Sequence, residues 1–323
     1  MLNLDLYDKI RLSLRPISQR LIAELFLRFD YRQVKIDVEG FDRLPEGPVI
    51  YAMNHTDNFN YWPFQYAMHR ELRRYMAAWV KGKNYEHPVV SRFMRATNNI
   101  PLASRGYLIT RDCLNTLSRR PTDDEYRALR TAVETHQAAE SPAPPELNTR
   151  ARDMLGRPFN PARESYGEAM SELFSELMRR FVALNQHAFD IGLDVLVFPQ
   201  GTRSIRLSRG HIGLAQMALH LGATIVPVGC SGSDHVYPGR SFRASPGHIT
   251  YRIGEPFAPE AWATLAPEGC SAPFDPEVEA RGRDAYQAVV DRVMERINTL
   301  VDEPYRFSED QESDGTRGTA RFV

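Results

Sequence analysis

The stretch DVLVFPQGTRS, residues 194–204, joins an apolar strand to a loop with distinctive chemistry. Its first five residues are almost all apolar, which is typical of a strand covered on both faces. Pro199 lacks the backbone N–H that a further strand residue would donate, so we expect the strand to end there. In the loop, Gly201 permits close backbone approach, while Thr202 and Arg203 supply a hydroxyl and a guanidinium fork. These groups suit phosphate, although a solvated basic loop has the same composition.

An earlier stretch, VIYAMNHTDNFN at residues 49–60, has the same organisation. The apolar run Val49 to Met53 predicts a buried strand, and a polar loop beginning Asn54-His55 follows it. In α/β proteins the loops at the carboxyl ends of strands build the active site. A histidine with a pKa near neutrality can take a proton from an attacking hydroxyl. His55 is therefore a candidate general base, although a lone histidine at a strand end is more often a structural hydrogen-bonding group.

Strands and helices alternate along most of the chain. The further strand candidates are Tyr31–Val38, Ala77–Val80, Ile225–Val228 and Ile249–Ile253. Helical spacing of apolar residues marks Glu164–Phe189, Ile212–Leu221 and a long C-terminal helix at Asp275–Asp302. This alternation predicts an α/β fold in which a mixed central sheet carries helices on its faces.

The composition is that of an ordinary globular protein, with 323 residues, 42% hydrophobic and 25% charged. The formal net charge of -1 gives no general attraction to nucleic acid, and we expect no nucleic-acid partner. The three cysteines, Cys113, Cys230 and Cys270, lack Cys-x-x-Cys spacing, which argues against a zinc site and indicates a reducing compartment such as the cytoplasm. No apolar run approaches the roughly 18 residues that span a bilayer. Lys9 and Arg11 interrupt any signal-peptide core.

The N-terminal segment, residues 1–30, has the pattern of an amphipathic helix. Its apolar residues recur at spacings of three and four, at Leu6, Ile10, Leu14, Ile17, Leu21 and Leu25. One interpretation is a helix whose leucine stripe packs on the core. The other is an interfacial helix on a membrane, because basic residues flank the stripe. The acidic residues Asp5, Asp8 and Glu24 favour the first interpretation.

The rest of the chain divides into one domain, residues 31–305, and a polar tail, residues 306–323, which we expect to be flexible. An insertion at about residues 112–161 interrupts the domain. It contains SPAPP at residues 141–145, which can hold neither a helix nor a central strand, and a charged helical pattern at 123–136. We interpret it as an exposed excursion. It is either a lid or partner surface, or a passive insertion of the kind that costs little stability.

Four blocks of sequence, in order, resemble the PlsC-like family of glycerophosphate and lysophosphatidate (1-acylglycerol-3-phosphate) acyltransferases. The blocks are Asn54-His55 with Asn60 at the later position, Asn99–Arg105, Phe198–Ser204, and the strand Ile225–Val228 with its central proline. Weaker similarity is found at Val80–Lys83 and in the strand that leads into Gly254-Glu255-Pro256. The resemblance covers residues 33–257 and implies a glycerol-3-phosphate acyltransferase-like fold.

The resemblance implies acyl transfer without a covalent enzyme intermediate. His55 would activate the acceptor hydroxyl, which attacks the acyl thioester. The residues implied to bind the acceptor and its phosphate are Arg105, Gln200, Gly201, Thr202, Arg203 and Ser204. The donor would be acyl-CoA or acyl-acyl carrier protein, and the acceptor a lysophospholipid used in phospholipid synthesis. The family needs no metal or cofactor. We expect a cytoplasmic protein with peripheral contact to the inner face of the membrane.

Two polar substitutions depart from the family pattern. Asn60 stands where the family has the aspartate partner of the histidine, and an amide can orient an imidazole but cannot stabilise its positive charge. In a serine protease the equivalent change lowers the rate by about four orders of magnitude. Asp57 either replaces the missing carboxylate or caps the following helix. Gln200 replaces the family's glutamate and keeps its hydrogen-bonding shape. The distance from Arg105 to Phe198 also exceeds the family's usual single helix.

Three functional hypotheses follow from this sequence. The first is an active acyltransferase that makes phosphatidate or a related lipid. The second is a lipid-binding or acyl-binding homologue in which Asn60 has weakened catalysis. The third is an active enzyme with a different hydroxyl acceptor.

Overall fold

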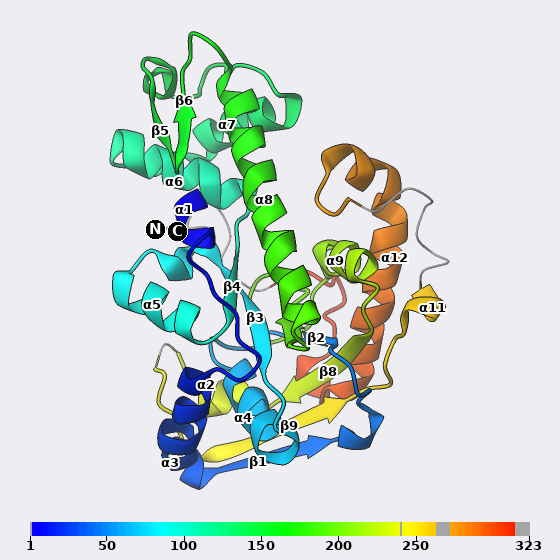
Figure 1. Cartoon of the computed structure of the whole chain (residues 1–323). Coiled ribbons are helices and arrows are strands. Elements are labelled where there is room, and N and C mark those ends of the chain that lie inside the picture. The colour runs from blue at the N-terminus through cyan, green and yellow to red at the C-terminus, as the bar shows by residue number, and fades with distance from the viewer. Residues whose placement is uncertain (1, 240, 263–271, 314–323) are drawn as a thin grey trace.

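The computed structural model describes residues 2–239, 241–262 and 272–313, and its centre is a mixed seven-stranded sheet (Figure 1). The strand order is β1-β9-β8-β2-β7-β3-β4. The strands are β1 (Val34–Glu39), β2 (Ile50–Met53), β3 (Met76–Lys81), β4 (Asn99–Leu102), β7 (Asp194–Val197), β8 (Ile225–Ser231) and β9 (Gly247–Ile253). All neighbouring strands pair in parallel except β8 and β9, which are antiparallel. The predicted α/β fold with a mixed sheet is confirmed.

The two strands singled out in the sequence are neighbours at the middle of the sheet. Ile50 of β2 lies opposite Val195 of β7, and Ala52 lies opposite Val197. All the residues of both strands are buried, as expected for parallel strands covered on both faces. Because β2 and β7 run in the same direction, the loops that follow them leave the sheet side by side.

Helices cover both faces of the sheet (Figure 1). The first face packs against α8 (Tyr166–Asp190), α9 (Gly213–Leu221) and α12 (Pro276–Leu300). The second packs against α4 (Tyr61–Leu72) and the helical run at residues 17–30. Successive side chains of β2 point to opposite faces of the sheet. Ile50 and Ala52 belong to the hydrophobic core on the first face, and Tyr51 and Met53 belong to the core on the second. The predicted long C-terminal helix is α12, which begins after Asp275, whose side chain accepts two backbone N–H bonds.

The N-terminal segment differs from the single helix predicted for it. A short helix, α1 (Leu4–Tyr7), is separated by an irregular stretch from a continuous helical run made of α2 (Ile17–Leu21), η1 (Ile22–Leu27) and α3 (Arg28–Asp30). Pro16 explains the break, because proline has no N–H to donate and disfavours helical backbone in the residue before it.

The leucine stripe also faces away from the core. Ile17, Leu21, Leu25 and Phe29 are 75%, 51%, 61% and 57% exposed. We call these four residues the outer stripe. The same helical run packs on the sheet through its opposite side, where residues such as Leu27 are buried. The interpretation that the stripe packs on the core is therefore wrong for residues 17–29.

The insertion is more tightly packed than the exposed excursion that we expected. Its predicted start, Asp112, lies inside helix α6 (Arg105–Leu117), and helix α7 (Asp123–Thr135) follows. Asp112 is buried and forms a two-pronged ion pair with Arg152 at the start of the hairpin β5 (Arg152–Met154) and β6 (Arg157–Phe159). Leu129 of α7 is fully buried in the main core.

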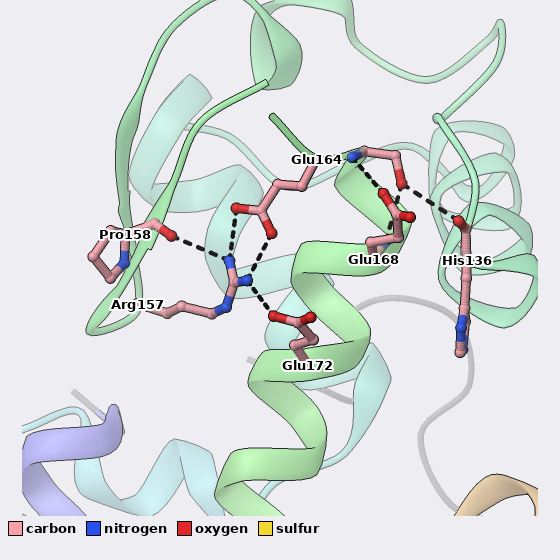
Figure 2. A network of polar contacts seen from close by, with 7 residues as sticks. His136, Arg157, Pro158, Glu164, Glu168 and Glu172 are labelled. Carbon is pink, nitrogen blue, oxygen red and sulfur yellow. Dashed lines mark hydrogen bonds and ion pairs between the residues drawn. The ribbon is translucent and has the colours of Figure 1, made fainter. Parts of the chain in front are cut away.

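A second network fixes the hairpin to α8. Figure 2 shows Arg157 between Glu164 and Glu172, with the Glu164 carboxylate accepting bonds of 2.9 and 2.6 Å. Beside it, Ser165 and Glu168 form a capping box at the first turn of α8. The insertion is therefore a folded extension of the domain, stacked against the N-terminal half of α8 (Figure 1).

Part of the predicted flexible tail is also ordered against the domain. After η7 (Glu303–Tyr305), the chain runs back along the loop that follows β7. The backbone N–H of Leu207 donates to the carbonyl of Tyr305 at 3.0 Å, and that of Arg209 donates to the carbonyl of Gln311 at 3.1 Å. The last ten positions, 314–323, lie outside the described residues, as does Cys270.

Candidate active site

Direct hydrogen bonds join the loop after β2 to the loop after β7. The backbone N–H of His55 donates to Oε1 of Gln200 at 3.0 Å. In return, the backbone N–H of Ser204 donates to the carbonyl of His55 at 2.9 Å. The structure therefore brings the predicted histidine and the predicted phosphate-binding turn together, although they are far apart in the sequence.

The His55 ring has a defined partner on its Nδ1 side. Nδ1 lies 3.3 Å from Oδ1 of Asn60, a residue that is completely buried. The amide of Asn60 is oriented by its own nitrogen, which donates to the carbonyl of Asn54 at 2.8 Å. The amide oxygen must then accept, so Nδ1 of His55 carries the proton and Nε2 keeps its lone pair. A histidine in this tautomer can accept a proton through Nε2.

The surroundings of the His55 ring are an aromatic side chain, a buried environment and two positive charges. Phe198 stacks on the ring, with the centroids 4.0 Å apart and the planes 15° apart. Burial lowers the pKa of His55 to about 3; the hydrogen bond with Asn60 opposes this shift, and the positive charges of Lys81 and Arg203 add to it. His55 is therefore an unprotonated base at neutral pH.

Asp57 points to its own loop rather than to the His55 ring. Its Oδ1 accepts from the backbone N–H of Phe59 at 2.7 Å, and its Oδ2 accepts from the hydroxyl of Thr56 at 2.9 Å. Burial raises the pKa of this carboxyl, and the bond from Phe59 opposes the shift. Helix α4 begins at Tyr61 with Asn60 as its N-cap residue. In this structure Asp57 is thus neither the partner of the histidine nor the helix cap. It closes a tight turn.

Gln200 is a bridge between loops rather than a substrate-facing group. It is buried, and besides accepting from His55 its amide nitrogen donates to the carbonyl of Arg206 and to the hydroxyl of Ser208, both at 3.3 Å. A glutamate at this position has no N–H and could not donate to the Arg206 carbonyl. This contact explains in physical terms why the amide is suited to position 200.

Two of the predicted binding groups of the turn, Thr202 and Arg203, remain accessible to solvent. Gly201 has φ +64°, and a Cβ there would meet the ring of His211 at 2.7 Å, so only glycine fits. Thr202 is partly exposed and Arg203 is exposed, whereas Ser204 is buried. The ring of His211 lies against Gly201, and its backbone N–H donates to the carbonyl of Pro199 at 2.8 Å.

Arg105 lies at the same edge of the sheet but packs away from His55. It is the first residue of α6, after β4, and its guanidinium sits 4.3 Å from the ring centroid of Phe174 on α8. Burial lowers the pKa of Arg105, and its charged surroundings include Glu279 of α12. In the strand order β7-β3-β4, the strand nearer to the site is β3. That strand ends in Lys81, whose charge acts on His55.

Lys81 is the site residue that sequence reasoning undervalued. It appeared only as part of the weakly similar stretch Val80–Lys83. The signal that could have identified it is its position as a cation at the end of an apolar strand, the same arrangement that marked His55. Among the described residues, no group of three or more histidine, cysteine or acidic side chains is placed to hold a metal ion.

Part of the chain is similar to a known protein family. Residues 35–138 match the family model described as Acyltransferase. This match, over less than half of the chain, indicates an acyltransferase. The matched residues include β1 to β4 together with His55, Asn60, Lys81 and Arg105, while the turn at residues 198–204 comes from the part of the chain beyond the match.

Among solved structures, this acyltransferase is similar to the 1-acyl-sn-glycerophosphate (LPA) acyltransferase PlsC from Thermotoga maritima. The two are 18% identical, the TM-score is 0.41, and the similarity covers 86% of this chain and 78% of the other. No curated protein matches the chain. None of the helices in the described ranges combines the length and apolar character that a bilayer span requires.

Proposed function

We propose that this acyltransferase moves a fatty acyl group from an acyl thioester, acyl-CoA or acyl-acyl carrier protein, to the free hydroxyl of a lysophosphatidate-like acceptor. The observation that carries the proposal is the contact between the His55 loop and the Gln200–Ser204 turn. It supports the proposal because it joins the loop that carries the neutral His55 to the turn that carries the exposed Arg203. A base and an anion anchor are the two groups that transfer to a phosphate-bearing alcohol needs.

The proposed reaction has one covalent exchange. As the acceptor oxygen forms a bond to the thioester carbonyl carbon, its proton moves to Nε2 of His55. Collapse of the tetrahedral intermediate breaks the carbon–sulfur bond, and the imidazolium returns the proton to the leaving thiolate. Arg203 and Lys81 would attract the acceptor phosphate, which converts a random encounter into an oriented one. Arg105, held against Phe174, would contribute from the edge of this region.

We also propose that the protein sits on the inner face of an anionic membrane through the outer stripe. Exposed arginines flank that stripe at positions 20, 28 and 32. The acidic residues of the same helix are already paired, Glu24 with His69 and Arg73, and Asp30 with Arg243. Arg32 packs over the Phe29 ring, and none of the three arginines forms an ion pair with a residue that the structure describes. An exposed apolar row between exposed arginines is the pattern of an interfacial helix, and anionic lipid adds attraction for each basic residue.

The membrane proposal has a direct test in vesicle flotation. Burying a leucine side chain contributes about 1.5–3 kcal/mol, so Leu21→Glu with Leu25→Glu should weaken binding to anionic vesicles at least about tenfold. Ala280→Glu, an exposed substitution on α12, is the matched control and should bind like the wild type. Equal binding of the double variant and the control would exclude this surface as the membrane contact.

A specific observation favours a second candidate, a lipid-binding homologue with weakened catalysis. In the described part of the chain, the ion pairs formed by histidine rings with carboxylates involve His69, His235 and His248, and not His55. A base without a carboxylate partner is a weaker catalyst. This candidate predicts that lysophospholipid binds without turnover.

The deciding experiment is acyl transfer from acyl-CoA and acyl-acyl carrier protein to lysophosphatidate, glycerol 3-phosphate and other lysophospholipids, with products identified by mass spectrometry. We expect thiol release only when an acceptor is present. His55→Ala should lower turnover by about 10²–10⁴-fold, because it removes the base. His187→Ala, at an exposed position on α8, is the matched control. Binding without turnover would support the second candidate, and unchanged turnover in His55→Ala would exclude the mechanism.

A further inference from the structure

Within residues 2–239, 241–262 and 272–313, no carboxylate forms a hydrogen bond or ion pair with the His55 ring. The group opposite Nδ1 of His55 is the neutral amide of Asn60, fixed in place by its bond to the carbonyl of Asn54. An amide oxygen can accept the Nδ1 proton, but it cannot balance the charge of an imidazolium. The nearest candidate carboxylate in sequence, Asp57, is occupied by Phe59 and Thr56.

The charges that act on the pKa of the His55 ring are positive. Lys81 comes from the end of β3, and Arg203 comes from the turn after β7, which is bonded to the His55 backbone through Gln200 and Ser204. The ring face is covered by the uncharged Phe198. The two positive charges oppose the proton that His55 must take during the reaction. In the unliganded protein, therefore, the base is correctly oriented but poorly able to become charged.

A phosphate-bearing acceptor changes this balance. Its phosphate carries about −1.5 to −2 charges at neutral pH. In a 1-acylglycerol 3-phosphate the free hydroxyl is on the carbon next to the one that bears the phosphate, so a hydroxyl at Nε2 brings the phosphate close to the ring. An opposite charge within about 4–6 Å typically moves a pKa by 1–3 units toward the charged form. The same phosphate would neutralise the two cations.

We propose that the acceptor's own phosphate supplies the negative charge that stabilises the His55 imidazolium, in the role that a protein carboxylate would otherwise have. This inference rests on the proposed function. It makes the phosphate a participant in the chemical step as well as an anchor. Acceptors without a phosphate then lose rate after they have bound, and a carboxylate restored at position 60 compensates for the missing phosphate.

The test compares two acceptors with the same acyl chain, 1-acylglycerol 3-phosphate and 1-acylglycerol, in the same mixed micelles under single-turnover conditions. At saturating acceptor, the wild type should transfer to the phosphate-free acceptor about 100-fold more slowly or worse, the scale on which general-base catalysis contributes. Inorganic phosphate added to the phosphate-free reaction should raise this rate, whereas sodium chloride at equal ionic strength should not. A purely anchoring phosphate would change KM alone and leave the saturated rates equal.

Asn60→Asp provides the second arm. It should raise the saturated rate on 1-acylglycerol at least tenfold and change the rate on 1-acylglycerol 3-phosphate much less. Equal gains on both acceptors, or equal saturated rates in the wild type, would overturn the inference. If Asn60→Asp fails to fold, the wild-type rates on the two acceptors and the effect of added inorganic phosphate still test the inference. Failure of the proposed function looks different, because no acceptor would then be acylated in a His55-dependent way.

Discussion

The two ends of the central strand pair β2 and β7 differ in whether their charged side chains are paired within the protein. At the starting end, the buried carboxylate of Asp194 accepts from Arg74 at 2.9 Å and from the backbone N–H of Val49 at 3.0 Å. At the finishing end, His55 has an amide where a carboxylate could stand, and Arg203 is exposed. The first end satisfies its charges within the protein. At the second end, Arg203 forms no ion pair with any residue that the structure describes, as the proposed binding of an anionic substrate requires.

The largest effect that we expect is on the free energy of unfolding, when the ion pair at the starting end is broken. Arg74→Ala leaves the Asp194 carboxylate buried without its cation, and breaking a buried ion pair from one side costs about 3–5 kcal/mol. We expect that loss in the free energy of unfolding measured by denaturant titration. Arg179→Ala removes an exposed ion pair with Glu176 and should change stability by less than about 1 kcal/mol. Similar losses for the two variants would show that the Arg74 pair is not a structural one.

At the finishing end, the same kind of substitution should change substrate binding instead. Arg203→Ala removes a charge-assisted bond worth about 1.5–3 kcal/mol and should raise KM for lysophosphatidate by about 10–100-fold, with little change in unfolding. Arg206 lies on the same loop, with its Nη2 3.9 Å from Oε1 of Glu303. The Arg206→Ala variant is therefore the matched control. Steady-state kinetics measures KM for lysophosphatidate in both variants. Identical KM values for them would contradict the assignment of Arg203 to the phosphate.

Much of this arrangement could be predicted from the sequence, because it depends on local patterns. The apolar runs before Pro199 and before Asn54 predict central strands, and parallel strands place their following loops at one edge. The helical break at Pro16 was also local, and was missed because the leucine spacing continued across it.

The remaining differences depend on tertiary contacts. The direction of the outer stripe depends on which side of the helix meets the sheet, which periodicity does not specify. The guanidinium of Arg105 packs on the ring of Phe174, which lies outside the four family-like blocks. The carboxylate of Asp57 accepts from the backbone N–H of Phe59, a bond that the residue types alone do not specify. Lys81 gained importance only when the strand order placed β3 next to β7.

A smaller effect concerns acid stability. Because the folded-state pKa of His55 lies below its unfolded value of about 6.5, the unfolded chain binds a proton first as pH falls. The neutral ring's contribution is fully present above pH 6.5 and is lost progressively toward pH 3. Between pH 7 and pH 5 the wild type should lose about 1–2 kcal/mol more than His55→Gln. Denaturant titrations at the two pH values measure this difference, and parallel losses in both proteins would argue against a depressed pKa.

The most direct test of the central claim is an NMR titration of the His55 ring nitrogens in the free protein and with lysophosphatidate bound. Our account predicts a neutral ring protonated at Nδ1 from pH 8 down to about pH 5 in the free protein, and a higher pKa when lysophosphatidate is bound. A ring protonated at Nε2, or an imidazolium already present near pH 7 without substrate, would contradict it.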